Sequence, residues 1–574
     1  MKAECRVLAN NDIAYLWWCV PEKIDGALGF SVHRELKNGS TRALPAWVGF
    51  KKVTSSAEVR NTDVWPIQSF QWKDVGAPRK GTFRYRIYVV KGTAEKPKRE
   101  ENPIFVTRWV YLREQFGPVR AVFNRGLLST QALKRGSNAP AKNANKLRAA
   151  ISTPGDTVRW RLSKELLPTL YDLLRRARKG GGSCSAALYE LTDEELIAEL
   201  MKTTGARIVL SNANSSITVN KKAKTVYDGT NQAARERLRG ALFDITDRML
   251  TGNHIGHNKF IVYSDATGPA AVLTGSTNWT PTGLCGQTNN ALLIENREVA
   301  THYEEYWKRL RAEIKPLQKP ALRTWARTKP LEVALGAAGK MKVWFSPNTT
   351  RLNTSKAEDP ADMLEVFDII DKARSIVLFL LFNPGSPSII ERIREREKAA
   401  ADAGKMLYVR GAISDAKTAR EGAVRVYSRS AKVGNRVITG VAGVPDDFGY
   451  WEKELLKLGH AAIHDKVLVV DPFSKNCAVV TGSHNLGYKA SFSNDENMVI
   501  IRGNKPIAEA YATHVLDVVN HYKWRYVLQY LHAKGELHKA WQDLREDDKW
   551  QYKYFHEGYL ASHDAFVLNA AGSG

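Results

Sequence analysis

The chain has 574 residues, of which 43% are hydrophobic and 25% are charged, values that are typical of a soluble globular protein and argue against wholesale disorder. This length predicts two or three domains. Lys and Arg number 85 against 60 Asp and Glu, a net charge of +25 that favours an anionic partner: nucleic acid, an anionic membrane surface or a phosphorylated substrate. A generally basic soluble surface is the alternative.

Cysteine usage and apolar runs narrow the class of protein further. The five cysteines are scattered and form no CxxC pair, which argues against a disulfide framework and against a zinc site. The first residues lack the pattern of a secretory signal peptide, and the longest apolar runs, 13–20 and 376–382, have the length of strands. The sequence therefore predicts no transmembrane segment and a protein that is cytoplasmic or peripheral to a membrane, with signal-independent export left open.

Residues 1–102 carry the signals of a small all-β domain. Aromatic and β-branched residues gather at 14–20, 28–33 and 83–90, and turn residues separate these segments. The pattern predicts a β-sandwich. A Trp-Trp pair on an early strand and Tyr-x-Ile-x-Val on a late one resemble a fibronectin type III-like module, which implies a binding or bracing role. The charged stretch 91–102 is expected to link it to the rest of the chain.

Strands and helices alternate from residue 103 onward, once over 103–318 and again over 319–574. In the first half we expect strands at 105–110, 119–123, 183–189, 206–210, 259–263 and 270–273, and helices at 162–178 (interrupted by Pro168), 193–201, 230–242 and 298–313. In the second half we expect strands at 341–345, 375–381 and 405–410, and helices at 363–374, 386–403 and 505–530, with a helical C-terminal extension. This alternation predicts two α/β lobes, each built on a mixed sheet.

The same set of polar residues occurs in both halves at the same spacing. The first copy is His257-Asn-Lys259, a hydrophobic run and Gly275-Ser276-Thr-Asn278. The second is His464-Asp-Lys466, a hydrophobic run and Gly482-Ser483-His-Asn485. The serine follows the histidine by 19 residues in both. An internal repeat of this kind predicts a pseudo-twofold arrangement of the lobes with one site at their junction.

The residue types in each copy fit the binding of an oxyanion. His and Lys at positions i and i+2 of a strand point to the same face, and the later turn supplies a hydroxyl, an amide and backbone N–H groups. Two facing copies suit a phosphodiester, whose oxygens gain charge in the transition state. Two histidines allow one to attack phosphorus and the other to protonate the leaving oxygen. The lysines supply positive charge, so we expect neither a metal nor another cofactor.

These residues resemble the signature of the phospholipase D superfamily, His-x-Lys-(x)4-Asp followed by Gly-Ser-x-Asn. The second copy fits it completely, with Asp471 at the aspartate position, whereas the first has Ser264 there. The resemblance covers roughly 105 to 545. It implies a two-lobed α/β fold, a covalent phosphohistidine intermediate and metal-independent cleavage or transfer at a phosphodiester.

One difference between the copies predicts separate roles for the histidines. Asn289 follows His257 by 32 residues, and Glu496 follows His464 by the same distance. If each partners its own repeat, Glu496 raises the basicity of His464 and favours its protonated form, while Asn289 leaves His257 closer to neutral. A nucleophile must be neutral and a general acid protonated. We therefore predict His257 as nucleophile and His464 as acid and base.

The predicted site thus has three groups of residues. The catalytic group is His257, Lys259, His464, Lys466 and Glu496. The phosphate-binding group is Ser276, Asn278, Ser483 and Asn485, and the supporting group is Asp471 and Asn289. Metal ligands are not among them.

The favoured function is cleavage or transfer of a phospholipid headgroup. A nuclease of the same superfamily is the alternative that the charge favours, and a polyanion-binding adaptor is a third. The basic stretches 129–155 and 414–450 are expected either to contact nucleic acid or an anionic membrane surface, or to be solvated loops.

Overall fold

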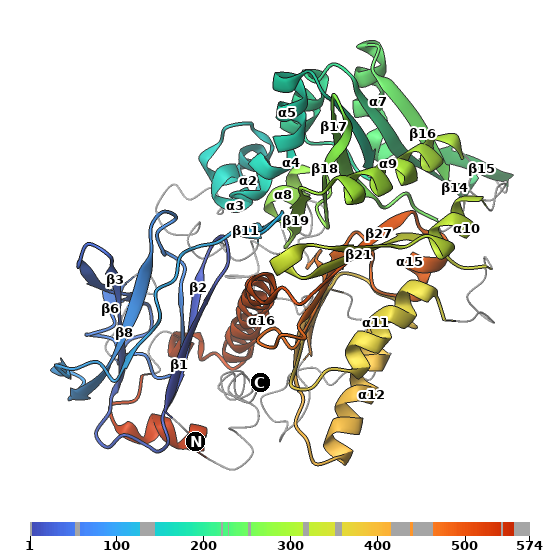
Figure 1. The fold of residues 1–574 in the computed structure, drawn as a ribbon. Helices are drawn as coiled ribbons and strands as arrows, with labels where there is room; N and C mark the ends of the chain where they lie inside the picture. Colours follow the sequence, from blue (N-terminus) through green and yellow to red (C-terminus); the bar gives the residue numbers. More distant parts are fainter. Residues whose placement is uncertain are drawn as a thin grey trace.

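The computed structural model describes three parts of the chain, a β-rich N-terminal part and two α/β lobes (Figure 1). It describes residues 3–51, 58–126, 144–219, 222–227, 229–250, 254–313, 321–350, 359–414, 437–439, 463–540 and 544–555. Most of the basic stretches 129–155 and 414–450 therefore lies outside the described residues. None of the described helices has the length and apolarity needed to cross a membrane.

The N-terminal part consists of antiparallel strands in two main sheets, and we call it the β module. The first sheet has the order β1 (Glu4–Ala9), β2 (Ala14–Cys19) and β7 (Gln71–Asp74). The second has the order β10 (Phe105–Val106), β8 (Phe83–Gly92), β3 (Gly29–Leu36) and β4 (Thr41–Ala43), and β9 (Pro97–Arg99) also pairs with β8. A short pair, β5 (Pro45–Ala46) and β6 (Arg60–Asn61), lies apart.

The first sheet of the β module is buried on both faces. Successive side chains of a strand point to opposite faces, and on β2 Leu16 and Trp18 pack inside the module while Tyr15 and Trp17 pack into the core of the α/β lobes. Trp17 and Trp18 are therefore both fully buried. The continuous apolar run that predicted this strand reflects a sheet that has a hydrophobic core on each side.

The β module extends beyond the predicted boundary at residue 102. Phe105 and Val106 pair with Ile87 and Arg86 of β8, so the segment predicted to open the first lobe is the last strand of the module. The first lobe begins with β11 (Gln115–Phe116). The charged residues and the proline of the stretch 91–102 predicted a linker, but this stretch contains the strand β9. Edge strands tolerate charged residues, so the charge did not exclude a strand.

Each α/β lobe is built on one mixed sheet, and the two sheets share their strand order. In lobe 1 the order is β11, β12 (Val119–Phe123), β19 (Asn290–Ile294), β18 (Gly268–Gly275), β17 (Lys259–Asp265), β13 (Ser183–Leu188), β14 (Ala206–Val219) and β15 (Lys222–Tyr227), with β16 (Asp244–Leu250) parallel to β14. In lobe 2 it is β20 (Leu331–Ala334), β21 (Lys340–Ser346), β27 (Glu496–Arg502), β26 (Ala478–Gly482), β25 (Lys466–Val470), β22 (Ile376–Leu381), β23 (Tyr408–Ile413) and β24 (Val437–Thr439). In both lobes the motif strand, β17 or β25, runs antiparallel to its neighbours.

Helices surround both sheets. Lobe 1 carries α2 (Ala144–Ser152), α3 (Thr157–Ser163), α4 (Leu166–Leu170), α5 (Asp172–Gly180), α6 (Glu194–Met201), α7 (Gln232–Gly240), α8 (Pro281–Cys285) and α9 (Arg297–Ala312), and α10 (Ala321–Thr328) follows it. Lobe 2 carries α11 (Ala361–Asp371), α12 (Ile389–Asp402), α15 (Tyr488–Ser493) and α16 (Lys505–Ala533). The helix predicted over 162–178 is divided, because the chain turns at Lys164, whose φ is 50°, and again at Tyr171.

The lobe 2 sheet lies between two layers of helix (Figure 1). Val377, Phe379 and Leu381 of β22 pack with α11 and α12, whereas the alternate residues of the strand pack in the core that contains α16. The long helix α16 also contacts β1, so it fills the space between lobe 2 and the β module. A strand buried on both faces explains the unbroken apolar run of β22.

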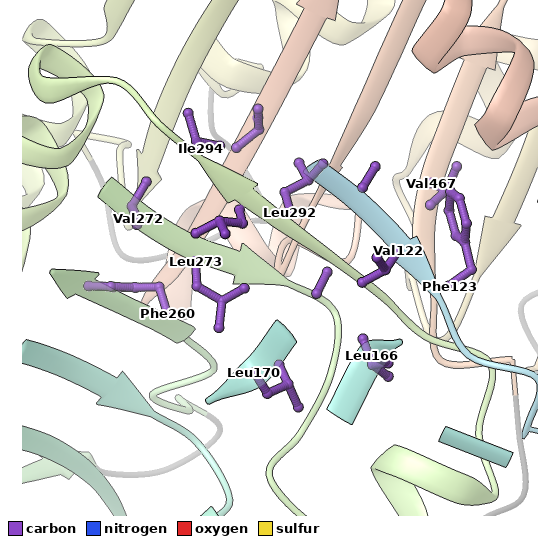
Figure 2. Packing of buried hydrophobic residues seen from close by; sticks show 14 of the residues in the cluster. Val122, Phe123, Leu166, Leu170, Phe260, Val272, Leu273, Leu292, Ile294 and Val467 are labelled. Atoms are coloured by element: carbon purple, nitrogen blue, oxygen red, sulfur yellow. The ribbon is translucent and has the colours of Figure 1, made fainter. Parts of the chain in front are cut away.

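The two lobes share one hydrophobic core. Figure 2 shows Phe123 of β12 close to Val467, which follows the second motif lysine on β25. Leu273 and Leu292 continue the same cluster into lobe 1. The lobes are therefore held face to face by apolar packing as well as by the polar contacts described below.

The C-terminal residues return to the β module and complete its core. Residues 544–555, which we call the C-terminal segment, include α17 (Tyr552–Phe555). Trp550 is buried between the two sheets, packs against Phe30 and Phe70 and donates from Nε1 to the Ala27 carbonyl at 2.8 Å. Gln551 pairs with both backbone groups of Ile24, at 3.0 and 2.9 Å. The C-terminal segment therefore folds together with the β module.

We predict that Trp550→Ala destabilises the β module, because it removes a buried indole and leaves a cavity; losses of this kind cost about 3–5 kcal/mol. Hydrogen exchange in β8 and proteolysis of the module should both accelerate strongly. The matched control is Tyr552→Ala, since Tyr552 is 48% exposed two residues away, and it should cost less than about 1 kcal/mol. Equal effects of the two substitutions would contradict this account of the C-terminal segment.

Candidate active site at the lobe interface

Backbone hydrogen bonds that cross between the lobes bring the two motifs together. The His257 N–H donates to the Asp495 carbonyl at 2.9 Å, and the Asp495 N–H donates to Ile255 at 3.0 Å. In the other copy the His464 N–H donates to the Thr288 carbonyl at 3.1 Å. Each motif therefore begins against the opposite lobe, and the centroids of the two imidazole rings lie 6.4 Å apart.

This crossing corrects the predicted pairing of the histidines. His257 Nδ1 lies 2.8 Å from Glu496 Oε2, and His464 Nδ1 lies 3.0 Å from Asn289 Oδ1. Each residue thus orients the histidine of the other lobe, so the assumption that each partners its own repeat is wrong. The physical reason is the register: Glu496 is next in the chain to Asp495, whose carbonyl binds the backbone of His257. Both acceptors fix the tautomer that keeps the proton on Nδ1 and leaves Nε2 for chemistry.

The two motif lysines lie at the same interface between the lobes, and each is held by a hydrogen bond to the backbone of its own motif. Lys259 Nζ donates to the His257 carbonyl at 2.6 Å, and Lys466 Nζ donates to the His464 carbonyl at 2.5 Å. Their side chains are 4% and 0% exposed. An ammonium carries three donors, so each lysine keeps donors for a bound anion after this bond is made.

The motif serines orient neighbouring amides. The Ser276 hydroxyl donates to Asn289 Oδ1 at 2.8 Å and accepts from the Asn290 N–H at 3.0 Å. Ser483 Oγ likewise accepts from the Asn497 N–H at 3.0 Å. Both serines are fully buried. In this arrangement the proton of Ser276 holds Asn289, and a role of the two hydroxyls in phosphate binding stays a prediction.

The motif asparagines keep polar atoms for a ligand. Asn278 Nδ2 donates to Glu190 Oε2 at 2.6 Å. In the described part of the chain, Asn278 Oδ1 and Asn485 Oδ1 are buried and have no hydrogen-bond partner. Buried polar atoms in this state are unusual, and because both are amide oxygens, a ligand would have to donate a hydrogen bond to pair with them.

Asp471 lies at the far end of the motif strand and does not touch the histidines. Its carboxylate accepts from the backbone N–H groups of Arg374, Ser375 and Ile376 at 2.8 to 2.9 Å. It therefore ties the end of β25 to the start of β22. The first copy has Ser264 at this position, beside an irregularity in the β17–β18 pairing, and its histidine and lysine are nonetheless in place.

Two aromatic residues that the sequence did not single out flank the histidines. Tyr189 lies 5.0 Å from the His257 ring and 5.0 Å from Lys259 Nζ, measured to the ring centroid. Phe382 lies 4.8 Å from the His464 ring and 5.0 Å from Lys466 Nζ. Both directly follow the strand next to the motif strand, β13 or β22. An aromatic residue at the same position in both halves was the one feature of the sequence that could have indicated these two residues.

Burial and mutual repulsion weaken proton binding throughout the site. Burial, with the two lysines, lowers the pKa of His257 to about 4 even though Glu496 opposes this shift. Burial, with Lys466, Lys259 and His257, holds the pKa of His464 well below its usual value. Burial lowers the pKa of Lys259 to about 7, and burial with the charge of Lys259 lowers that of Lys466. An anion bound between these groups would restore their protons.

The arrangement is suited to an oxyanion with a tetrahedral centre. Two ammonium groups lie beside two imidazoles, which allows attack on phosphorus from one side and protonation of the leaving oxygen from the other. Among the described residues, no group of three or more His, Cys, Asp or Glu side chains is arranged to hold a metal ion.

Comparison with known proteins identifies the first of the two halves. Residues 170–311 match the family model described as "Cardiolipin synthase, PLD-like domain". This match contains the first motif and confirms the resemblance to the phospholipase D superfamily. No curated protein matches the chain at a significant level.

Several solved structures are similar over parts of the chain. Phosphatidylserine synthase from Haemophilus influenzae Rd KW20 is 12% identical, with 67% of this chain and 94% of that chain covered and a TM-score of 0.39. Nuc, a phospholipase D family member from Salmonella typhimurium, is 20% identical over 34% of this chain and 96% of that one, with a TM-score of 0.18. Polyphosphate kinase from Porphyromonas gingivalis is 13% identical over 61% of this chain, which spans 44% of that kinase, with a TM-score of 0.37.

We predict that the site binds sulfate and that the affinity falls as the pH rises. Lys259, whose pKa is about 7, is charged below that value and neutral above it, while sulfate remains a dianion. Calorimetric titration should show affinity at least about tenfold weaker at pH 8.5 than at pH 6, since a charge-assisted hydrogen bond contributes about 1.5–3 kcal/mol.

The matched variants are Lys259→Met, which should bind weakly at both pH values, and Lys202→Met, which should behave as the unchanged protein. Lys202 caps the C-terminal end of α6. Its side chain is 60% exposed and forms an ion pair with Glu199 of the same helix. Affinity that is equal at the two pH values would contradict a role for a titrating lysine.

Proposed function

We propose that the protein is a metal-independent phosphodiesterase of the phospholipase D type that cleaves or transfers the headgroup of a phospholipid. The observation that carries this proposal is that two His-x-Lys motifs meet at the interface between the lobes, with the centroids of their imidazole rings 6.4 Å apart. Reacting atoms approach to about 3–3.5 Å before a bond forms. One phosphorus atom between the rings can thus face a nucleophile on one side and an acid on the other.

In the first step His257 Nε2 attacks phosphorus and the bond from phosphorus to the leaving oxygen breaks. His257 is neutral above a pH of about 4, so its lone pair is available at neutral pH. Glu496 accepts the Nδ1–H and compensates the positive charge that develops on the ring as the N–P bond forms. His464 transfers a proton to the leaving oxygen.

In the second step His464 removes a proton from water or an alcohol, whose oxygen attacks phosphorus. The P–N bond breaks and His257 is restored. The partner of His464 is the neutral amide oxygen of Asn289, which stabilises a protonated ring less than a carboxylate would. An imidazolium in this setting gives up its proton readily. A bound phosphodiester supplies the negative charge that protonates it.

The proposed roles are those expected from the sequence, but on different grounds. The sequence argument assigned the carboxylate to His464 and made that ring the acid because it would be charged. With Glu496 on His257, the same charge instead supports a nucleophile that becomes cationic. The assignment now rests on the hydrogen bonds to Nδ1, a carboxylate for His257 and a neutral amide oxygen for His464.

Two other functions remain as alternatives. The net charge of +25 favours a nuclease of the same superfamily, because phosphate contacts dominate affinity for nucleic acid. Two motifs in one chain, preceded by a β module, favour the lipid enzyme. An adaptor that binds polyanions without cleaving them is the third function.

We also propose a pseudo-twofold axis between the two histidines and a fibronectin type III-like architecture for the β module. The shared strand order of the two α/β sheets supports the axis. The module's two facing antiparallel sheets support the second assignment. The proposed domains then meet near residue 113, after β10, and near residue 319.

The proposed function predicts that the purified protein releases headgroups from mixed phospholipid vesicles in the presence of EDTA. His257→Ala and His464→Ala should each reduce the rate by at least about 10³-fold, because each step needs both rings. The same preparations should be offered single- and double-stranded DNA. Cleavage of DNA alone would establish the nuclease, and tight DNA binding without any cleavage the adaptor. Loss of all cleavage in EDTA would refute the metal-free reaction.

The separate roles predict different behaviour with bis(4-nitrophenyl) phosphate, whose leaving group needs no acid. His464→Ala should release one equivalent of nitrophenol in a burst and then stall, with phosphate attached to residue 257. His257→Ala should give no burst. Peptide mapping of the trapped protein identifies the attached residue, and a burst from His257→Ala with phosphate on His464 would reverse the assignment.

A further inference from the structure

We propose that the β module takes part in the reaction by fixing the position of His464. The positioning residues through which it acts are Asn11, His514 and Asp465. This inference rests on the proposed function, in which His464 must hold one place as an acid and then as a base. It is carried by buried contacts that run without a break from the β module to the second motif.

The contacts begin where the β module meets the edge of the lobe 1 sheet. β11 pairs only with Val119 and Arg120 of β12, so it does not reach Phe123. Asn11 takes that place, since its Nδ2 donates to the Phe123 carbonyl and its Oδ1 accepts from the Phe123 N–H, both at 3.1 Å. Asn11 and Phe123 are both buried, so the β module satisfies two backbone groups of β12 that would otherwise lack a partner.

From Phe123 the contacts continue to the residue that follows His464. The His514 ring of α16 stacks on Phe123 with the ring centroids 4.4 Å apart, and His514 Nε2 lies 2.9 Å from Asp465 Oδ2. Asp465 Oδ1 accepts from Asn290 Nδ2 at 2.8 Å. Burial raises the pKa of Asp465, but the charge and the hydrogen bond of His514 outweigh this effect and hold it below its usual value. The carboxylate is therefore charged and is held at both oxygens.

A second path leads from the same place to the His464 ring. Asn124 follows Phe123 and binds both backbone groups of Asn289: its N–H donates to the carbonyl at 3.2 Å, and its Oδ1 accepts from the N–H at 2.9 Å. Asn289 Oδ1 in turn lies 3.0 Å from His464 Nδ1. A shift of β12 would thus move both the amide that orients His464 and the residue beside it in the chain.

The first half of the site contains a neutral counterpart of the Asp465–His514 pair. The Tyr306 hydroxyl of α9 accepts from Asn258 Nδ2 at 3.1 Å, and the Tyr306 ring stacks on Phe345 with the ring centroids 4.1 Å apart. Phe345 and Phe123 hold equivalent places, because each pairs with the asparagine that binds the middle residue of the opposite motif.

The supports of the two equivalent phenylalanines differ. Phe345 lies against Trp325 of α10, with the ring centroids 5.7 Å apart, whereas Phe123 is held by Asn11 of the β module. One motif is therefore supported by a helix that follows lobe 1, and the other by a separate domain. This difference gives the β module a specific connection to His464.

The position of His464 affects the two steps unequally when the leaving group needs no acid. With bis(4-nitrophenyl) phosphate, attack by His257 releases nitrophenolate without a proton donor, whereas the second step still needs His464 to remove a proton from water. A displaced base slows the second step alone, because small displacements of reacting groups reduce the rate steeply. A general loosening of the fold would slow both steps.

The test measures the two steps separately in the full-length protein. Release of nitrophenolate with protein in excess over bis(4-nitrophenyl) phosphate reports the first step, and decay of the covalent adduct, followed by mass spectrometry, reports the second. His514→Phe keeps a ring on Phe123 and removes the bond to Asp465. Asn11→Ala removes both bonds to Phe123 and leaves lobe 2 unchanged. The double variant Asp465→Asn/His514→Tyr installs the neutral pair of the first half.

We expect His514→Phe to leave the first step unchanged and to slow decay of the adduct at least about tenfold, the loss typical of a misplaced catalytic group. Asn11→Ala should slow the same step by a smaller factor. The double variant should decay at nearly the rate of the unchanged protein, because it restores the bond and the stacking. Since Asn11→Ala and His514→Phe lie in different domains, failure of one to fold leaves the other as a test.

The matched control is Lys73→Met. Lys73 of the β module donates to Asp517 of α16 at 2.7 Å, outside the path to His464, so both steps should keep their rates. The inference would be overturned by equal slowing of the two steps, by a double variant as slow as His514→Phe, or by an equal effect of Lys73→Met and Asn11→Ala.

The outcomes also separate this inference from the proposed function. Two measurable steps that respond equally to every variant would overturn the inference and leave the phosphodiesterase in place. Absence of nitrophenolate release from the unchanged protein would overturn both.

Discussion

The crossed backbone pairing between the lobes is the constraint on which the site depends. The His257 N–H binds the Asp495 carbonyl, and the His464 N–H binds the Thr288 carbonyl. Because neighbouring residues of an extended segment point to opposite sides, this register decides which side chain faces which histidine. It brings Glu496 to His257 and Asn289 to His464. A lobe on its own would contain a motif with neither its orienting residue nor its second histidine.

A second set of contacts holds the same register through side chains. Asn290 Nδ2 donates to Asp465 at 2.8 Å, and Asn497 Nδ2 donates to Asn258 at 2.9 Å, so an amide of each lobe binds the middle residue of the opposite motif. Arg248 and Asp495, both buried, add a bidentate ion pair at 2.7 and 3.1 Å. A buried polar group without its partner costs free energy. A shifted register would break several of these bonds at once, and this favours a single arrangement of the lobes.

The sequence predicted the features that occur in both halves of the chain, and it did not predict the contacts that cross between the two lobes. Equal spacing from histidine to serine predicted that two motifs serve one site, and strand–helix alternation predicted most elements of both sheets. The chain distances from His257 to Asn289 and from His464 to Glu496 are equal, so no spacing could distinguish pairing within a lobe from pairing between lobes. The end of the β module was also hidden, because β10 has only two residues and its partner strand lies earlier in the chain. Trp550 and Gln551 gave no local sign that they pack against residues 24–70 of the β module, at least 480 positions earlier in the chain.

The asymmetry of the site has a structural counterpart outside it. Asp465, the middle residue of the second motif, binds His514 of α16 at 2.9 Å, and His514 stacks on Phe123. Asn11 of the β module pairs with both backbone groups of Phe123 at 3.1 Å. The second motif is thus braced by contacts that continue into the β module, whereas the first motif has the uncharged Asn258 in that place.

The first motif instead has its carboxylates, Glu496 and Glu190, beside the reacting groups. If His257 forms the covalent bond, it is the ring that needs a compensating charge, while His464, which exchanges protons, needs mainly a fixed position. The two halves of the repeat have the same motif residues and differ in what supports them, and that difference suits two rings with different tasks.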